Sequence, residues 1–255
     1  AEKGRLSEAI LGVVRGLNEV TFLLVRGVLE YAPVGVFALI AVTLGRTGLA
    51  ALVPLAKLTG VVYGGIALQI GLYVLLLALF GVSQRRFWSV AQDPMLMAFV
   101  TRSSNGTLPV TMQAAERLGI KESLYGFSLP LGATINMDGT ALYIGASVVF
   151  VANVAGVDLT LAQLLGVILT GVLASIGTAG VPGAGLIMLS LAITQAGLPM
   201  APVGLVAGID AILDMIRTMC NVTGDLVGTQ IVARTEPGMV EVPEAVPVKQ
   251  PSPAG

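Results

Sequence analysis

Five polar residues with the chemistry to bind ions share one side of a predicted helix near the C-terminus. They follow one another at intervals of three or four residues, as Asp210, Asp214, Arg217, Asn221 and Asp225. At 100° per residue they lie at about 0, 40, 340, 20 and 60° around the helix axis, within one narrow stripe. A planar guanidinium binds a carboxylate in a bidentate manner, and a carboxylate binds an ammonium group. The stripe therefore predicts a site for a small zwitterion that carries one additional negative charge.

A simpler interpretation of the stripe is an internal salt bridge, in which Arg217 neutralises Asp214 three residues earlier. That interpretation leaves the remaining acids of the stripe unexplained. It also leaves out Asp138, which lies in the middle of a separate apolar segment. Charged groups at membrane depth cost at least about 2.5 kcal/mol each, so these acids need partners or ligands.

A second group of residues, which offers only oxygen ligands, predicts a site for a hard cation beside the zwitterion site. Asp138 and Asp225, together with backbone carbonyl groups over 132–136, offer oxygen atoms and no nitrogen or sulfur. Sodium is the natural candidate, and the absence of histidine weakens a proton relay.

Composition indicates what kind of chain carries these residues. Of 255 residues, 55% are hydrophobic and only 11% are charged, against roughly 25% charged in an ordinary soluble domain. The formal net charge of -1 provides no basic surplus for nucleic acid, and a single cysteine and no histidine exclude the usual zinc sites and histidine-dependent triads. We expect an all-α integral membrane protein that crosses a cell membrane several times.

The apolar segments differ in length, and this difference predicts their topology. A spanning helix needs about 20 apolar residues, and several arms here have only about 10 to 15. The predicted elements, in chain order, are a helix over 17–44 kinked near Pro33, a span over 50–81, a re-entrant hairpin turning within 101–109, a helix over 123–155 broken at 136–140, a second re-entrant hairpin turning within 175–185, and a last helix over 202–233. We accordingly expect N-terminal membrane helices in residues 1–83, a transport core in 84–236 and a disordered tail in 237–255.

Basic residues predict from which side each hairpin enters. Arg85, Arg86, Arg117 and Lys121 flank the first hairpin, whereas the loops around the second hairpin contain no Lys or Arg. The hairpins therefore enter from opposite faces and form an inverted repeat, an arrangement that is typical of transporters with a binding site near the bilayer midplane.

The two predicted hairpin tips differ in chemistry. Residues 103–107 offer hydroxyl and backbone N–H groups, which attract carboxylates at a helix N-terminus; the alternative is a plain interfacial turn. Residues 178–185 contain three glycines and a proline, which favours a mobile lid; the alternative is a glycine-rich packing segment.

Two other classes of protein also use acidic residues within a membrane. An intramembrane aspartyl protease could use Asp138 and Asp225, but Arg217 on the same stripe argues against a proton-sharing dyad. An ion channel fits less well, because re-entrant lids on opposite faces suit alternating access better than an open pore.

Four ordered motifs, at residues 103–111, 136–140, 177–185 and 214–225, resemble the dicarboxylate/amino acid:cation symporter family. The resemblance covers about residues 5–236 and is greatest to archaeal and bacterial sodium-coupled aspartate/glutamate transporters. It implies an elevator-type symporter that is trimeric in the family and that carries acidic amino acids together with sodium.

Site residues follow from this resemblance by motif position. The substrate α-carboxylate would meet Ser104 and Asn221, its amino group Asp214, and its side-chain carboxylate Arg217 with Thr140. The implied substrate-binding residues are Arg102, Ser104, Thr140, Val181, Gly185, Asp214, Arg217, Thr218 and Asn221. The implied sodium-binding residues are Gly132, Thr134, Asn136, Asp138, Ser175, Ile176, Thr178, Asn221 and Asp225.

The sequence departs from the family pattern in two respects. Asn105 stands where relatives usually have a third serine. Several family helices that precede the equivalent of Leu17 are not in this sequence; they form the trimeric scaffold and contribute hydroxyl ligands to a third sodium site. We expect the binding core within this sequence, and a homotrimer where the scaffold helices are present.

Overall fold

The computed structural model describes residues 52–240 without a break, together with scattered positions between 12 and 48. Within 52–240 every regular element is an α-helix, as expected for an all-α membrane protein. In chain order the helices are α2 (Leu52–Leu79), α3 (Gln84–Thr101), α4 (Ser104–Arg117), α5 (Glu122–Ile135), α6 (Asp138–Val154), α7 (Leu161–Ile176), α8 (Ala184–Gln195) and α9 (Val203–Thr235). The first predicted span falls mostly outside the described residues.

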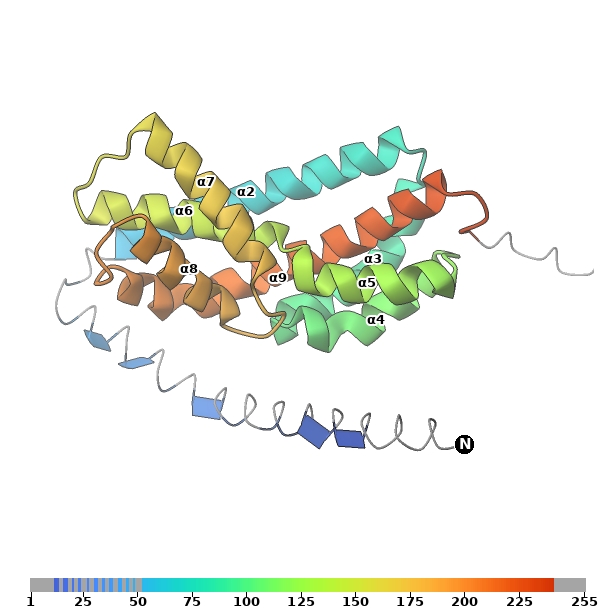
Figure 1. Ribbon diagram of the computed structural model, residues 1–255, viewed down its shortest axis with the longest axis horizontal. Coiled ribbons are helices and arrows are strands. Elements are labelled where there is room, and N and C mark those ends of the chain that lie inside the picture. Colours follow the sequence, from blue (N-terminus) through green and yellow to red (C-terminus); the bar gives the residue numbers. More distant parts are fainter. Residues whose placement is uncertain are drawn as a thin grey trace, which may run out of the picture.

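Helix α9 lies at the centre of the structure. It packs against α6 and α8 toward one end and against α3, α4 and α5 toward the other, and α2 packs along it (Figure 1). The whole polar stripe from Asp210 to Asp225 is buried in this position. The prediction that these five residues lie on one continuous helix is confirmed, and all five are buried.

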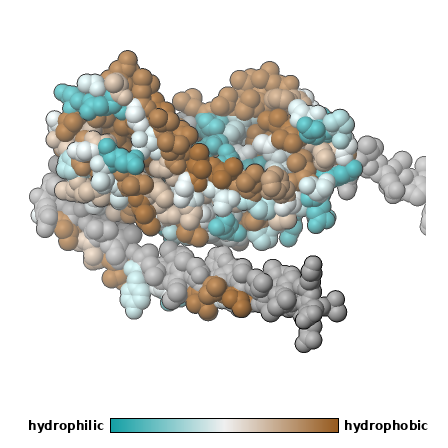
Figure 2. All heavy atoms as spheres, in the orientation of Figure 1, coloured by the Kyte–Doolittle hydropathy of each residue, from teal (hydrophilic) through white to brown (hydrophobic). Residues whose placement is uncertain are grey.

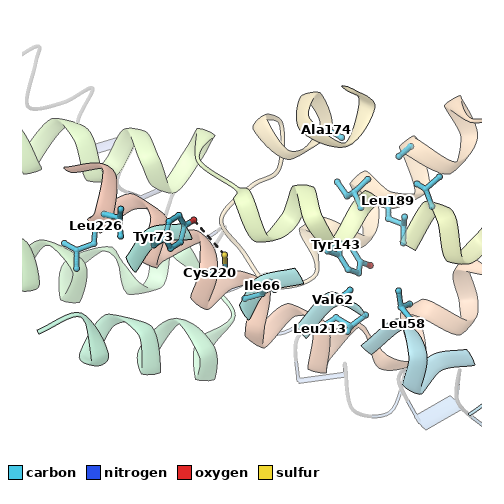
Figure 3. Packing of buried hydrophobic residues seen from close by; sticks show 14 of the residues in the cluster. Leu58, Val62, Ile66, Tyr73, Tyr143, Ala174, Leu189, Leu213, Cys220 and Leu226 are labelled. Atoms are coloured by element: carbon cyan, nitrogen blue, oxygen red, sulfur yellow. Dashed lines mark hydrogen bonds between the residues drawn. The ribbon is translucent and has the colours of Figure 1, made fainter. Parts of the chain in front are cut away.

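Helix α2 is the longest uninterrupted apolar helix, and it packs directly against α9 and α6. Its 28 residues extend about 42 Å at 1.5 Å per residue. Leu58 and Val62 of α2 gather with Leu213 of α9 and Tyr143 of α6 in one buried cluster (Figure 3). By length and composition, α2 and the segment Glu122–Val154 could each cross a membrane.

The first helical hairpin consists of α3 and α4, which pack against each other and turn at residues 102–103. Arg102 ends α3 in the left-handed region, with φ at 56°. Ser103 then caps α4, because its side chain accepts a hydrogen bond from the Gly106 N–H at 3.0 Å. These two residues reverse the chain within a very short turn.

The break between α5 and α6 falls inside the predicted stretch 136–140. Asn136 and Met137 have non-helical backbone angles, and Asp138 begins α6. Polar groups at both new helix ends are thereby left for other side chains to bind.

The second helical hairpin consists of α7 and α8, joined by residues 177–183. Thr160 and Gln163 form a capping box that begins α7. Gly183 has φ at 78°, a conformation that strains other residues, and α8 begins immediately after it.

The chain after α9 turns back onto the start of α5. Lys121 N–H donates to the Met239 carbonyl at 3.0 Å, and Ile120 pairs with Val240. The sequence predicts a disordered tail from residue 237, but residues 239 and 240 pair with 121 and 120; residues 241–255 lie outside the described residues.

Apolar side chains cover much of the outer surface. Figure 2 shows them gathered along α7, in the view of Figure 1. The exposed residues of α7 include Leu161, Leu165, Ile168, Leu169, Val172 and Leu173. A surface of this kind suits lipid or a further apolar helix better than water.

Candidate functional site

A small cavity forms where the turns of both hairpins meet the helix break and α9. Its lining residues are Arg102, Ser104, Met137, Thr140, Thr178, Ala179, Gly180, Val181, Gly185, Asp214, Arg217, Thr218 and Asn221. All nine residues predicted to bind substrate are among them, so the structure brings this set together; their binding role stays a prediction. The cavity volume is about 10 Å³, room for about one water molecule.

Arg217 is the charged centre of this cavity, and it is paired within the protein. Its Nη1 lies 3.0 Å from Asp210 Oδ1 and its Nε lies 2.9 Å from Asp214 Oδ1. Its guanidinium carbon lies 4.3 Å from the centre of the Tyr143 ring, which provides a cation–π contact. The arrangement is the internal salt bridge of the simpler interpretation, extended by Asp210.

Asp210 and Tyr143 were not predicted as neighbours of Arg217. The spacing of Asp210 and Arg217 is about two helical turns, which could have indicated the pair. Tyr143 comes from α6, and only the packing of α6 on α9 brings its ring under the guanidinium.

Glycine residues allow this close packing. A Cβ atom at Gly185 would lie 2.6 Å from Cζ of Arg217, so the guanidinium rests against the backbone of α8. A Cβ atom at Gly139 would collide with the backbone of Arg217, so α6 and α9 also touch at this level.

Asn221 holds the first turn of α6. Its Oδ1 accepts from the Gly139 N–H at 2.8 Å and the Thr140 N–H at 3.4 Å. Its Nδ2 donates to Thr140 Oγ1 at 3.1 Å and to Met137 Sδ at 3.1 Å. The amide therefore satisfies N–H groups that the helix break leaves without intrahelical partners.

Asp214 connects α9 to the turn of the second hairpin. Its Oδ2 accepts from the Gly183 N–H at 3.0 Å, and its Oδ1 accepts from Thr218 Oγ1 at 3.1 Å. Together with its ion pair to Arg217, this carboxylate has a donor at both oxygens. It therefore holds the turn of the second hairpin on α9 and positions it over the cavity.

The turns of the two hairpins contact each other directly. Ser103 Oγ donates to the Gly180 carbonyl at 2.8 Å, and the Asn105 N–H donates to the same carbonyl at 3.1 Å. A Cβ atom at Gly180 would lie 3.0 Å from the Ala133 carbonyl and from the Asn105 side chain. The two turns therefore close over the cavity at a position where only glycine fits without displacement.

A second group of polar residues surrounds the helix break. Asn136 Nδ2 donates to Asp225 Oδ1 at 2.8 Å and is 3.4 Å from the Asn221 carbonyl. A Cβ atom at Gly132 would lie 2.6 Å from Asp225 Oδ1, so these predicted sodium ligands come together. Asp138 accepts from the Tyr73 hydroxyl and, at 3.5 Å, from Gln69 Nε2. Neither α2 residue was predicted to take part.

The remaining predicted sodium ligands lie at the ends of α5 and α7. Ser175 and Thr178 are buried, and the Ser175 carbonyl accepts from the Thr178 N–H at 3.0 Å. The Thr134 hydroxyl bonds to carbonyls of its own helix, and the Ile176 side chain is exposed. Among the described residues no three acidic, cysteine or histidine side chains converge. A cation here would therefore rely on carbonyl and amide oxygens beside a carboxylate.

Paired helical hairpins and a broken helix around buried charges are features that secondary transporters commonly share. The chain matches the profile of the sodium:dicarboxylate symporter family over residues 1–235, and it belongs to this family. Members of this family are transporters and not enzymes, which excludes the protease alternative.

Three relatives illustrate the range of the family. The chain is 34% identical over 234 residues to a proton/sodium-glutamate symport protein of Bacillus subtilis (strain 168), covering 91% of this chain and 54% of the relative. It is 37% identical over 231 residues to a proton/glutamate-aspartate symporter of Escherichia coli (strain K12), covering 90% and 53%. It is 35% identical over 238 residues to a C4-dicarboxylate transport protein of Cupriavidus pinatubonensis, covering 91% and 54%. The chain thus spans about half the length of these relatives.

Proposed function

We propose that this chain forms the substrate- and cation-binding core of a sodium-coupled symporter for an acidic amino acid, aspartate or glutamate. The observation that carries the proposal is Arg217, a buried guanidinium held between Asp210 and Asp214 in a cavity closed by two hairpin turns. Family membership and relatives named for glutamate, aspartate and C4-dicarboxylates support the same class of substrate.

Substrate binding is an exchange of ion-pair partners. The side-chain carboxylate of the substrate takes the place of Asp210 on Arg217, so the guanidinium stays neutralised throughout. The substrate ammonium binds Asp214, and its α-carboxylate binds at Ser104 and Asn221. Because one carboxylate replaces another, the guanidinium itself is never left unpaired in the buried site, whereas Asp210 loses its partner.

The second hairpin acts as a lid in this proposal. The cavity of about 10 Å³ is far smaller than an amino acid, so residues 177–183 have to withdraw before substrate enters. The Gly180 contact with the first hairpin and the Gly183 contact with Asp214 are the bonds that open. Glycine-rich backbone permits this movement.

Sodium fits the oxygen-rich group at the helix break. Asp138 and Asp225 are linked to neutral amide and hydroxyl donors, and neither forms an ion pair within the part of the chain that the structure describes. A buried carboxylate at Asp225 and a half-buried one at Asp138, both without a basic partner, favour a bound cation. A hard cation also suits carboxylate and carbonyl oxygens. Sodium would neutralise this region as the substrate binds on Arg217.

The membrane arrangement follows from helix length. The hairpin helices α4 and α8 have 14 and 12 residues and extend only about 21 and 18 Å, against about 30 Å of hydrocarbon. The proposal therefore includes two re-entrant hairpins in inverted topology, in a multi-pass protein of the cell membrane. The proposal also includes a homotrimer in which further helices form a scaffold and the binding core moves across the membrane in an elevator-type mechanism.

Calorimetric titration of the purified chain tests this proposal. We expect L-aspartate to bind in sodium chloride and not in choline chloride. Succinate, which lacks the ammonium group that Asp214 would bind, should bind more weakly than aspartate. Equal aspartate binding in choline would contradict sodium coupling, and tighter succinate binding would transfer the assignment to C4-dicarboxylates.

A further inference from the structure

Tyr73 brings α2 into contact with the residues at the helix break. Its side chain is buried, and its hydroxyl donates to Asp138 Oδ2. The same hydroxyl lies 3.9 Å from Cys220 Sγ of α9, as the dashed line in Figure 3 shows. None of the sodium-binding residues predicted from the sequence lies on α2.

Gly224 provides the space in which these polar groups meet. A Cβ atom there would lie 2.6 Å from the Tyr73 hydroxyl oxygen, 2.8 Å from Asn136 Nδ2 and 3.0 Å from Asp138 Oδ2. Groups from α2, from the break and from the start of α6 therefore converge on one point of α9. A side chain at position 224 would collide with these groups, and glycine lets them approach one another.

The chemistry of a phenol suits this position. A tyrosine hydroxyl has one proton and two lone pairs, and the proton here is donated to Asp138. The lone pairs stay on an uncharged oxygen, which is a suitable ligand for a hard cation. Gln69, about one turn earlier on α2, donates to the same carboxylate oxygen at 3.5 Å and keeps it directed toward α2.

We propose that Tyr73 is a further residue of the cation site at Asp138, its hydroxyl oxygen binding sodium while its proton holds the carboxylate in place. This inference rests on the proposed sodium coupling. It adds a residue of α2 to the groups proposed to surround the cation at Asp138.

The test is a sodium titration of the full chain without substrate. Sodium binding is measured in two ways, by calorimetry and by the rise in unfolding temperature that sodium causes. Tyr73→Phe removes only the hydroxyl, and we expect it to weaken sodium binding about tenfold. Tyr63→Phe is the matched control, because the Tyr63 hydroxyl on the same helix bonds to the Ile212 carbonyl at 3.1 Å, away from Asp138. It should leave the sodium affinity within about twofold of wild type.

The titration also separates a ligand from a structural tyrosine. A purely structural role would lower the unfolding temperature equally in sodium and in choline, whereas a ligand role reduces the difference between the two salts. An unchanged sodium affinity in Tyr73→Phe, with binding intact in wild type, overturns the inference alone. Absence of sodium binding in wild type overturns the proposed coupling together with it.

A second variant tests the same inference if Tyr73→Phe does not fold. Gln69→Leu keeps the size of the side chain and removes the second donor to Asp138. We expect about threefold weaker sodium binding, because the carboxylate loses one of its two partners on α2. Unchanged sodium affinity in this variant would also overturn the role of α2.

Discussion

Arg217 and Asp210 lie about two turns apart on α9, and their side chains form a buried ion pair with 3.0 Å between Nη1 and Oδ1. The protein therefore supplies its own carboxylate where the proposed substrate would place one. This internal carboxylate balances the charge of the guanidinium and holds it in position before substrate arrives. It also lowers the net gain from binding, because the pair has to be broken first.

Removing this competitor should strengthen substrate binding. In Asp210→Asn, Arg217 keeps Asp214 as a partner and no carboxylate has to be displaced. We expect aspartate to bind roughly tenfold more tightly, equivalent to about 1.4 kcal/mol, in calorimetry at saturating sodium. Asp93→Asn, which removes an exposed partner of Arg117, is the control and should leave affinity unchanged. Weaker binding in Asp210→Asn would show that Asp210 positions the guanidinium and does not compete.

The shape of the guanidinium should matter as much as its charge. Arg217→Lys keeps one positive charge but cannot reach Asp210 and Asp214 with two separate nitrogens. We expect aspartate affinity to fall about 100-fold, while the neutral amino acid serine is affected much less. Arg117→Lys, at an exposed ion pair, is the matched control. Full aspartate affinity in Arg217→Lys would remove this arginine from the substrate site.

Crowding the guanidinium should have a similar effect without a change of charge. Gly185→Ala places a Cβ atom 2.6 Å from Cζ of Arg217 and forces one of them to move. Aspartate affinity should fall about tenfold, with a small loss of thermal stability. Gly166→Ala on α7 meets nothing within 4 Å and provides the control. Equal affinities in the two variants would mean that Arg217 moves away from α8 without cost to binding.

The sodium dependence of aspartate binding should change when Asp225 is substituted. Its carboxylate accepts from Asn136 Nδ2 at 2.8 Å and has no ion-pair partner among the described residues. Asp225→Asn removes one charged oxygen ligand, so we expect the sodium concentration for half-maximal aspartate binding to rise about tenfold or more. Asp158→Asn, in an exposed loop, tests for a general effect of charge. An unchanged sodium requirement would exclude Asp225 as a ligand.

Much of this architecture could be predicted from local sequence. The helical period placed five polar residues on one side of α9, and Asn136 to Gly139 indicated where a helix is broken. The contacts between helices could not be predicted in the same way. Tyr73 and Asp138 are 65 residues apart, and their contact depends on how α2 packs against α6. Whether Arg217 binds Asp210 or a ligand likewise depends on side-chain geometry that spacing does not determine.

The interruption at residues 136–137 has a consequence for biogenesis. With 14 and 17 residues, α5 and α6 extend about 21 and 25 Å, so neither half spans about 30 Å of hydrocarbon alone. On the proposed membrane assignment the two halves enter the bilayer together, with Asp138 near the middle of the inserting segment. Synthesis proceeds from the N-terminus, so Tyr73 is synthesised first and can donate its hydroxyl proton to that carboxylate. Asn136 is likewise synthesised before its partner Asp225. Asp210, in contrast, is synthesised about two helical turns before its counter-ion Arg217.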